Sequence, residues 1–242
     1  MTGAVHADQT RMIILAADTS TKTGGVALVE DETPVAEYTL NVSETHSARL
    51  MPTIDRVLTD CGMEIADVDA LAVAIGPGSF TGLRIGLATF KGLALAADKR
   101  LVAVPTLDAL AASVAFSRHM ICPILDARMD EVYAAFYRFN DGLCEKLSED
   151  MVAPVEELFG KTDEAVVILG DGIPLYRDRI VATLGERAVF APQRLWIPRA
   201  VNVAAIAKSR LDKGESDDID TLEPIYLRKS EAERKWGKSK KK

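Results

Sequence analysis

The sequence is poor in the residues that build metal centres and disulfide frameworks. Among its 242 residues are only three cysteines and three histidines, and no Cys-x-x-Cys pair occurs. An odd number of widely spaced cysteines indicates free thiols in a reducing cytoplasm. No second histidine or cysteine stands at helical ligand spacing, so we predict no metal site. The residues concerned are Cys61, Cys122, Cys144, His6, His46 and His119.

Long apolar runs and a signal-type beginning are also missing. No run approaches the roughly 20 apolar residues of a membrane-spanning helix. Residues 1–10, which we expect to form a loose tail, lack the charged-then-apolar order of a signal peptide. With 48% hydrophobic and 27% charged residues, the composition is typical of a soluble protein, and we expect no membrane contact and a cytoplasmic location.

Charge is unevenly distributed along the chain. The overall net charge is −7, yet residues 228–242 contain eight Lys or Arg and two Glu. An acidic body repels nucleic acid at long range, whereas the basic tail could contact RNA phosphates or an acidic partner. The alternative, which we favour, is a solvated, disordered end.

The order of predicted elements repeats, which indicates an internal duplication. The first half predicts a three-strand meander, a helix, a strand, a long helix, a strand and a helix, at 12–17, 25–30, 34–40, 50–61, 70–75, 81–97, 101–104 and from 106. The second half predicts strands at 121–125, 131–139, 143–149 and 166–169, with helices at 154–159, 174–184 and 200–211. We therefore predict two α/β lobes with mixed sheets, 11–117 and 118–227, facing each other across a cleft. We expect the last helix, 199–213, to pack back on the first lobe.

A glycine-rich turn between a strand and the long helix is the most informative segment. It reads Ile-Gly-Pro-Gly-Ser-Phe-Thr-Gly-Leu-Arg-Ile-Gly over residues 75–86. It is not a P-loop, because Leu83 follows Gly82 where a lysine would be required. It is not a dinucleotide fingerprint either, because its glycine spacing differs and no acid ends the next strand. An open helix N-terminus favours anions, and the alternative is a tight turn with Ser79 or Thr81 as the N-cap.

The long helix at 81–97 is apolar on more than one face. Arg84 and Lys91 are its only charges before Asp98, and small residues recur at four-residue spacing. One side can pack on its own sheet, and the other indicates a second body, either a partner chain or the second lobe. We favour a partner and name as its interface, on this helix and the one at 47–61, Leu50, Ile54, Val57, Arg84, Leu87, Phe90 and Lys91.

A carboxylate and two hydroxyls follow the first buried strand, at Asp18, Thr19 and Ser20. Such a turn could hold a metal–phosphate group, and these three residues are our candidates for cofactor binding. The alternative is an Asx turn that satisfies its own backbone. No Gly-x-Ser-x-Gly elbow is present, so a serine-hydrolase function is not supported.

Four segments together resemble the TsaB (YeaZ) family, most specifically the glycine turn at 75–86. The others are Asp18 to Ala27, His46 to Pro52 and Val104 to Leu110. The resemblance implies an actin-like, sugar-kinase-like fold of two ribonuclease-H-like lobes. It further implies an accessory subunit that binds and activates a TsaD-like catalytic subunit, with a TsaE-like ATPase. That complex moves threonylcarbamoyl from its adenylate to N6 of the adenosine next to the tRNA anticodon.

Departures from the catalytic relative favour a subunit with no catalytic residue and no cofactor of its own. By the resemblance, Thr106 and Leu110 stand where that relative has metal-binding histidines, and the turn at 125–130 lacks its glycines. Gly170-Asp171-Gly172 keeps a trace of an adenosine loop. We expect a homodimer in isolation, tRNA contact only through the complex, and ATP or ADP, where present, at the complex interface. The alternative function is a sugar-kinase-like phosphotransferase or ATPase.

Overall fold

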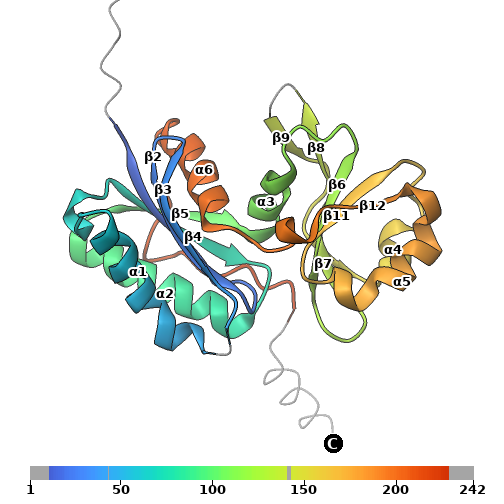
Figure 1. Cartoon of the computed structure of the whole chain (residues 1–242), viewed down its shortest axis with the longest axis horizontal. Coiled ribbons are helices and arrows are strands. Elements are labelled where there is room, and N and C mark those ends of the chain that lie inside the picture. The colour runs from blue at the N-terminus through green and yellow to red at the C-terminus, as the bar shows by residue number, and fades with distance from the viewer. Residues whose placement is uncertain (1–10, 43, 141–142, 229–242) are drawn as a thin grey trace, which may run out of the picture.

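The computed structural model describes residues 11–42, 44–140 and 143–228, which form two lobes side by side (Figure 1). The expected N-terminal tail and all of the basic C-terminal tail except Arg228 lie outside these residues. Each lobe is built on a mixed sheet with helices packed against it. This arrangement confirms the predicted two-lobe α/β fold.

The first lobe contains a five-stranded sheet in the order β3-β2-β1-β4-β5. Strands β1 to β3 are antiparallel, whereas β4 runs parallel to β1 and β5 runs parallel to β4. The strands are β1 Ile13–Asp18, β2 Gly24–Glu30, β3 Thr33–Leu40, β4 Ala70–Gly76 and β5 Arg100–Pro105.

Helices cover both faces of this first sheet, which is why β1 is apolar throughout. Helices α1 (His46–Asp60) and α2 (Phe80–Ala97) lie together on one face, and α6 (Ala200–Leu211) lies on the other, near α3 (Thr106–Ala111) (Figure 1). Alternate residues of β1 point to opposite faces. Leu15 therefore joins the core beneath α1 and α2, whereas Ile14 joins the core beneath α6.

The second lobe repeats this arrangement in the order β10-β7-β6-β11-β12, again antiparallel on one side of the central strand and parallel on the other. A hairpin of β8 and β9 pairs with β6 beside this path. The elements are β6 Met120–Asp126, β7 Val132–Ala134, β8 Tyr137–Asn140, β9 Leu143–Lys146, β10 Met151–Ala153, α4 Val155–Phe159, β11 Val166–Leu169, α5 Ile173–Leu184 and β12 Ala188–Phe190. Short 3₁₀ turns occur at Ile65–Asp67, Ala112–Val114, Gly185–Arg187 and Gln193–Leu195.

The predicted meander of the second lobe was wrong in detail. The expected strand at 131–139 is two strands, β7 and β8, because the chain breaks at Phe136. There the backbone amide of Phe136 donates to Ser148 Oγ, and its carbonyl accepts from Leu147 N, so it leaves the β6–β7 ladder. The third antiparallel strand of this sheet is β10, which lies beyond the predicted span.

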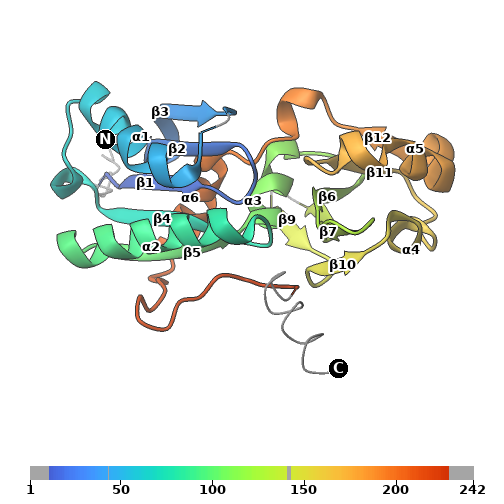
Figure 2. The same ribbon diagram turned by 90° about the horizontal axis from the view of Figure 1, so that it is seen from below.

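After α6 the chain returns along the first lobe as an extended segment, Asp217–Arg228, which we call the strap. It runs beside β5 and α2 and ends near the junction of the two lobes (Figure 2). It starts by bonding to β5, where Asp217 N donates to Leu101 O at 2.9 Å. Further on, Ile225 N donates to Ile75 O at 2.8 Å, and Ile225 packs on the core of the first lobe.

All three cysteines are free thiols, as predicted. Burial raises the pKa of Cys122 far above its usual range and that of Cys144 to about 11, so neither is primed as a thiolate. In the described part of the chain, every helix is too short or too polar to cross a bilayer.

Candidate functional site

The turn after β1 is closed on itself. Asp18 Oδ1 accepts from Ser20 N at 2.8 Å and from Ser20 Oγ at 2.6 Å, which is the Asx turn considered as the alternative. All three candidates for cofactor binding, Asp18, Thr19 and Ser20, are buried. Asp18 Oδ2 has no hydrogen-bond partner, and burial raises the pKa of this carboxyl above its ordinary value.

The glycines of the predicted motif let α2 pack directly against this turn. A Cβ added at Gly82 would meet Thr19 O at 2.0 Å, and one at Gly86 would meet Thr19 Oγ1 at 2.3 Å. Thr19 Oγ1 donates to Gly82 O at 2.8 Å, and Ser79 N donates to Ser20 O. Ser79 is the N-cap of α2, because its Oγ accepts from Gly82 N. The motif therefore brings two parts of the protein's own backbone together.

His46 and Arg49, at the start of α1, hold the other side of the same turn. The side chain of Arg49 is buried and donates to the carbonyls of Lys22 and Leu40. His46 Nε2 lies 2.8 Å from Thr21 O, and its Nδ1 lies 3.0 Å from Arg49. These partners fit a neutral imidazole that donates through Nε2 and accepts through Nδ1. Burial, aided by the charge of Arg49, lowers the pKa of His46 and favours that neutral form.

The corresponding turn of the second lobe binds a cation from within the chain. Arg128, Met129 and Asp130 have φ values of 63°, 56° and 62°, although none is glycine. Arg228, at the end of the strap, donates to Ala127 O at 2.5 Å and to Arg128 O at 3.0 Å, and it pairs with Glu131. The groups that face Arg228 here are carbonyl and carboxylate oxygens. Such oxygens suit a cation and repel a phosphate.

The residues between the lobes do not fit a metal–phosphate group. A cavity of about 330 Å³, lined by residues that include Lys22, Asp171 and Trp196, lies beside the Asp18 turn. The hydroxyls of Thr19 and Ser20 are engaged within the protein, and burial, which raises the pKa of Asp18, disfavours the charge with which its free oxygen would bind a metal. Among the described residues, no three His, Cys, Asp or Glu side chains converge on a metal position. The glycine of the expected adenosine trace, Gly170, instead packs on Ile124 O, which a Cβ would meet at 2.0 Å.

The two positions that, by the resemblance, correspond to metal-binding histidines are filled by packing. Thr106 is fully buried at the start of α3, and its Oγ1 accepts from Gly76 N at 3.2 Å. Leu110 is fully buried in the core between α3 and β6. Neither side chain faces a space in which a metal could sit.

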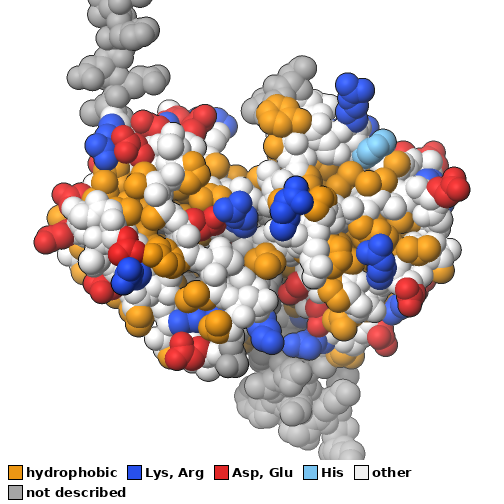
Figure 3. All heavy atoms as spheres, in the orientation of Figure 1, with side chains coloured by type: hydrophobic (Ala, Val, Ile, Leu, Met, Phe, Trp, Pro, Cys, Tyr) orange, Lys and Arg blue, Asp and Glu red, His pale blue; other side chains and the backbone are white. Residues whose placement is uncertain are grey.

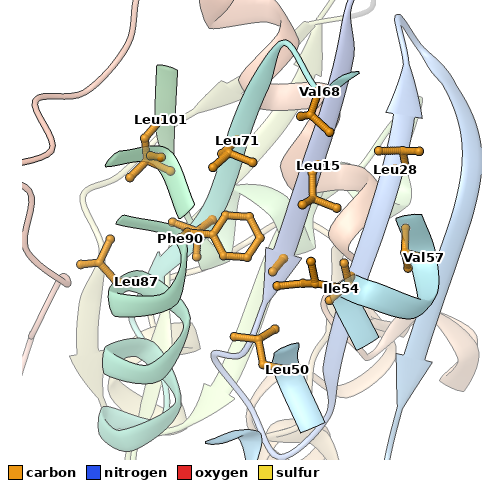
Figure 4. Close-up of a cluster of buried hydrophobic side chains, with 14 of the residues drawn as sticks. Leu15, Leu28, Leu50, Ile54, Val57, Val68, Leu71, Leu87, Phe90 and Leu101 are labelled. Atoms are coloured by element: carbon orange, nitrogen blue, oxygen red, sulfur yellow. The ribbon is translucent and has the colours of Figure 1, made fainter. Parts of the chain in front are cut away.

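Five of the seven predicted interface residues point the wrong way. Leu50, Ile54, Val57, Leu87 and Phe90 converge with the sheet residues Leu15, Leu28 and Leu71 in one buried cluster (Figure 4). Their burial contradicts the prediction that these side chains meet a partner. The reason is geometric, because the most apolar stripe of each helix is the one that covers its own sheet.

The outward stripes of the same two helices are exposed, and that of α2 carries one charge. On α2 the stripe comprises Thr81, Arg84, Ala88, Gly92, Leu95 and Ala96. On α1 it comprises Ser47, Ala48, Met51, Pro52, Asp55, Arg56, Thr59 and Asp60. Leu95 is 65% exposed and Met51 47% exposed. Among the described side chains on the face drawn in Figure 3, apolar, acidic and basic ones alternate without a broad basic field.

The strap lies beside the α2 surface and binds the side chains of both cationic residues predicted there, Arg84 and Lys91. Lys91 Nζ donates to Leu222 O at 2.9 Å, and Arg84 Nε donates to the hydroxyl of Tyr226 at 2.8 Å. Between α2 and the strap lies an open groove of about 380 Å³. Arg84 and Lys91 therefore lie at the predicted surface, with their side chains ordered by this chain.

Sequence reasoning missed the strap. Its residues Leu222, Ile225 and Tyr226 stand at the i, i+3 and i+4 spacing of a helix, but Pro224 lies among them and the segment is extended, so the spacing does not predict the conformation found. The signal available was Tyr226, close before the basic tail that begins at Arg228.

Comparisons with known proteins agree with this architecture. The family model for TsaD, tRNA N6-adenosine threonylcarbamoyltransferase, matches residues 40–236. The tRNA threonylcarbamoyladenosine biosynthesis protein TsaB of Bacillus subtilis is 38% identical over 233 residues, covering 95% of this chain and 100% of that protein. The Escherichia coli protein of the same name is 34% identical over 233 residues, covering 93% of this chain and 98% of that protein.

A solved structure described as YeaZ from Pseudomonas aeruginosa superposes with a TM-score of 0.77 and 30% identity. The match covers 89% of this chain and 100% of that one, so it extends over both lobes. Sequence and fold agree over nearly the whole length, and the resemblance seen in the four motifs is confirmed. The chain belongs to the TsaB (YeaZ) family.

Proposed function

We propose that this chain is a non-catalytic subunit of tRNA threonylcarbamoyladenosine synthesis that binds and activates a TsaD-like catalytic subunit. The observation that carries the proposal is the exposed outer face of α1 and α2, where Met51, Ala88, Gly92 and Leu95 leave a smooth, weakly charged surface. Small residues on a helix let a second helix approach closely. We place the protein in the cytoplasm, where the tRNA that the proposed complex modifies is found.

The interior of the chain supports an accessory role. The turns at Asp18 and Arg128 are filled by hydrogen bonds and an ion pair within the protein, which leaves no cradle for a transferred group. The described residues offer no set of nucleophile, base and metal ligands for a peptidase or a phosphotransferase. We therefore place any nucleotide of the complex at the joint between subunits and not in the cleft of this chain.

The same face gives a second copy of the chain a place to bind when the catalytic subunit is missing. We propose a homodimer in isolation, with the catalytic subunit competing for α1 and α2. A TsaE-like ATPase then joins the pair, and tRNA is reached through the complex.

Reconstitution tests the proposal directly. Purified TsaD-like and TsaE-like proteins from the same genome are incubated with unmodified tRNA and threonylcarbamoyl-adenylate, with and without this chain. We expect modified adenosine to form many times faster when the chain is present. Equal rates in both mixtures would reject the proposed function.

Two exposed leucines provide a matched pair of variants for the same assay. Leu95, on α2, and Leu175, on α5 of the second lobe, are 65% and 64% exposed. We expect Leu95→Glu to abolish both self-association and stimulation of the catalytic subunit, because it buries a charge at the proposed interface. Leu175→Glu, which adds the same charge elsewhere, should leave both unchanged. Equal behaviour of the two variants would place the interface off α2.

A further inference from the structure

Arg84 is held in one orientation by its own helix and by the strap. Its guanidinium lies over the ring of Phe80, 3.9 Å from the centroid, and its Nε donates to the hydroxyl of Tyr226. Tyr226 in turn stacks on Phe80, with centroids 4.6 Å apart and an interplanar angle of 30°. Residues far apart in the sequence thus fix a long side chain that would otherwise be free on the surface.

Within the part of the chain that the structure describes, the terminal amino groups of this guanidinium have no acceptor. In the described residues, the hydrogen bonds of Arg84 end with the one to Tyr226, and it takes part in no salt bridge. A guanidinium carries five N–H donors in one plane, and stacking on a ring occupies its face while leaving those edges open. Arg84 is therefore an exposed cation with a fixed fork and unused donors.

The surroundings of the fork select a particular kind of ligand. The groove beside it, about 380 Å³, has apolar walls from Leu87, Ala88 and Pro224 and opens between α2 and the strap. Lys91 adds a second positive charge, and Glu223 is the one acidic residue of the lining. A ligand with an apolar shaft and a carboxylate tip matches this order of groups. The groove is also continuous with the exposed stripe of α2 through Ala88.

We infer that this groove is the receptor for a carboxylate side chain, Asp or Glu, on the TsaD-like subunit, with Arg84 as its two-pronged anchor and Tyr226 as the residue that positions the anchor. Bidentate Arg–carboxylate pairs combine charge with a fixed geometry, which a lysine cannot reproduce. Because the fork is already ordered, less side-chain entropy is lost when the carboxylate binds. The inference rests on the proposed function and adds to it the chemistry of the contact.

The test measures the affinity of the full chain for the purified TsaD-like subunit by calorimetry. We expect Arg84→Lys to weaken binding about tenfold and Arg84→Gln more than that, because the first keeps the charge and loses the fork. Tyr226→Phe keeps the ring and loses the tether, so we expect a loss of about threefold. Raising the salt concentration should weaken the native complex more than the complex of Arg84→Gln.

The second lobe provides the control. Arg177, on α5, is also exposed and stacked on an aromatic ring, 4.1 Å from the centroid of Phe190. Arg177→Lys makes the same chemical change away from the groove and should bind as the native chain does. Thermal unfolding of each variant identifies any loss that comes from misfolding. Arg84→Glu combined with single Asp→Arg or Glu→Arg changes on the surface of the catalytic subunit should recover affinity at one position.

The outcomes separate this inference from the proposed function. Native affinity in folded Arg84→Lys would overturn the carboxylate receptor and leave the partner surface intact. A native chain that does not bind the catalytic subunit at all would reject both. Weaker self-association of Arg84→Lys with unchanged partner binding would assign the groove to a second copy of the chain and overturn the inference.

Discussion

The turns that follow β1 and β6 occupy equivalent places in the two lobes, yet they are packed in opposite ways. In the first lobe, glycines remove side chains so that α2 and the Asp18 turn meet backbone to backbone. In the second lobe, the residues from Arg128 to Asp130 have side chains although their backbone lies in the left-handed region. Arg228, at the end of the strap, donates a hydrogen bond to this turn. Both turns are thus filled by atoms of the protein itself. The comparison shows that the two lobes pack equivalent turns by different means.

The largest effect should come from adding one methyl group to α2 where it meets the first turn. Gly82→Ala places a Cβ where Thr19 O lies only 2.0 Å away, so the turn or the helix must move. We expect a loss of about 3 kcal/mol or more in the free energy of unfolding, measured with urea. Gly92→Ala on the same helix meets nothing within 4 Å and should raise that free energy by roughly 0.5–1 kcal/mol through helix propensity. Equal effects of the two changes would refute the close packing.

A smaller effect is expected from breaking the second turn. Arg228→Gln removes the ion pair with Glu131 and weakens the bonds to the carbonyls of Ala127 and Arg128. Left-handed residues other than glycine cost roughly 1–2 kcal/mol each, so the turn depends on such contacts. We expect a loss of about 1–3 kcal/mol and faster hydrogen exchange over residues 126–131. The matched change Arg128→Gln removes a side chain that is 84% exposed and should cost less than about 0.5 kcal/mol. Unchanged exchange in Arg228→Gln would show that the turn holds itself.

Much of the first lobe was predictable because its signals are local. The apolar run of β1, the stripe of α1 and the glycine turn each predicted an element that the structure contains. The facing of α1 and α2 was not predictable, because a helix apolar on several sides does not reveal which side meets its own sheet. The sequence therefore predicts that Leu87 and Phe90 point outward, whereas in the structure both pack in the core beneath the helix. The strap was not predictable, because its contacts, such as the one between Arg84 and Tyr226, join residues that are far apart in the sequence.

The smallest expected effect is also the one that best separates the accessory function from its alternative. Asp18 is buried with one oxygen unpaired, and burial raises its pKa from 3.8. A carboxyl whose pKa is higher in the folded state than in the unfolded state stabilises the fold at low pH. That contribution is lost as the pH rises through the folded pKa.

Asp18→Asn keeps the acceptor for Ser20 and removes the charge, so at pH 7 the variant should unfold at equal or higher urea concentration than the native chain. Its advantage should shrink as the pH falls through the raised folded pKa and be gone below about 3.8, where the carboxyl is protonated in both states. Stimulation of the catalytic subunit should stay within about twofold of native, because in the proposed function the carboxylate of Asp18 does not act on a substrate. A phosphotransferase would need this charge, so a loss of activity in a folded Asp18→Asn chain would favour that alternative.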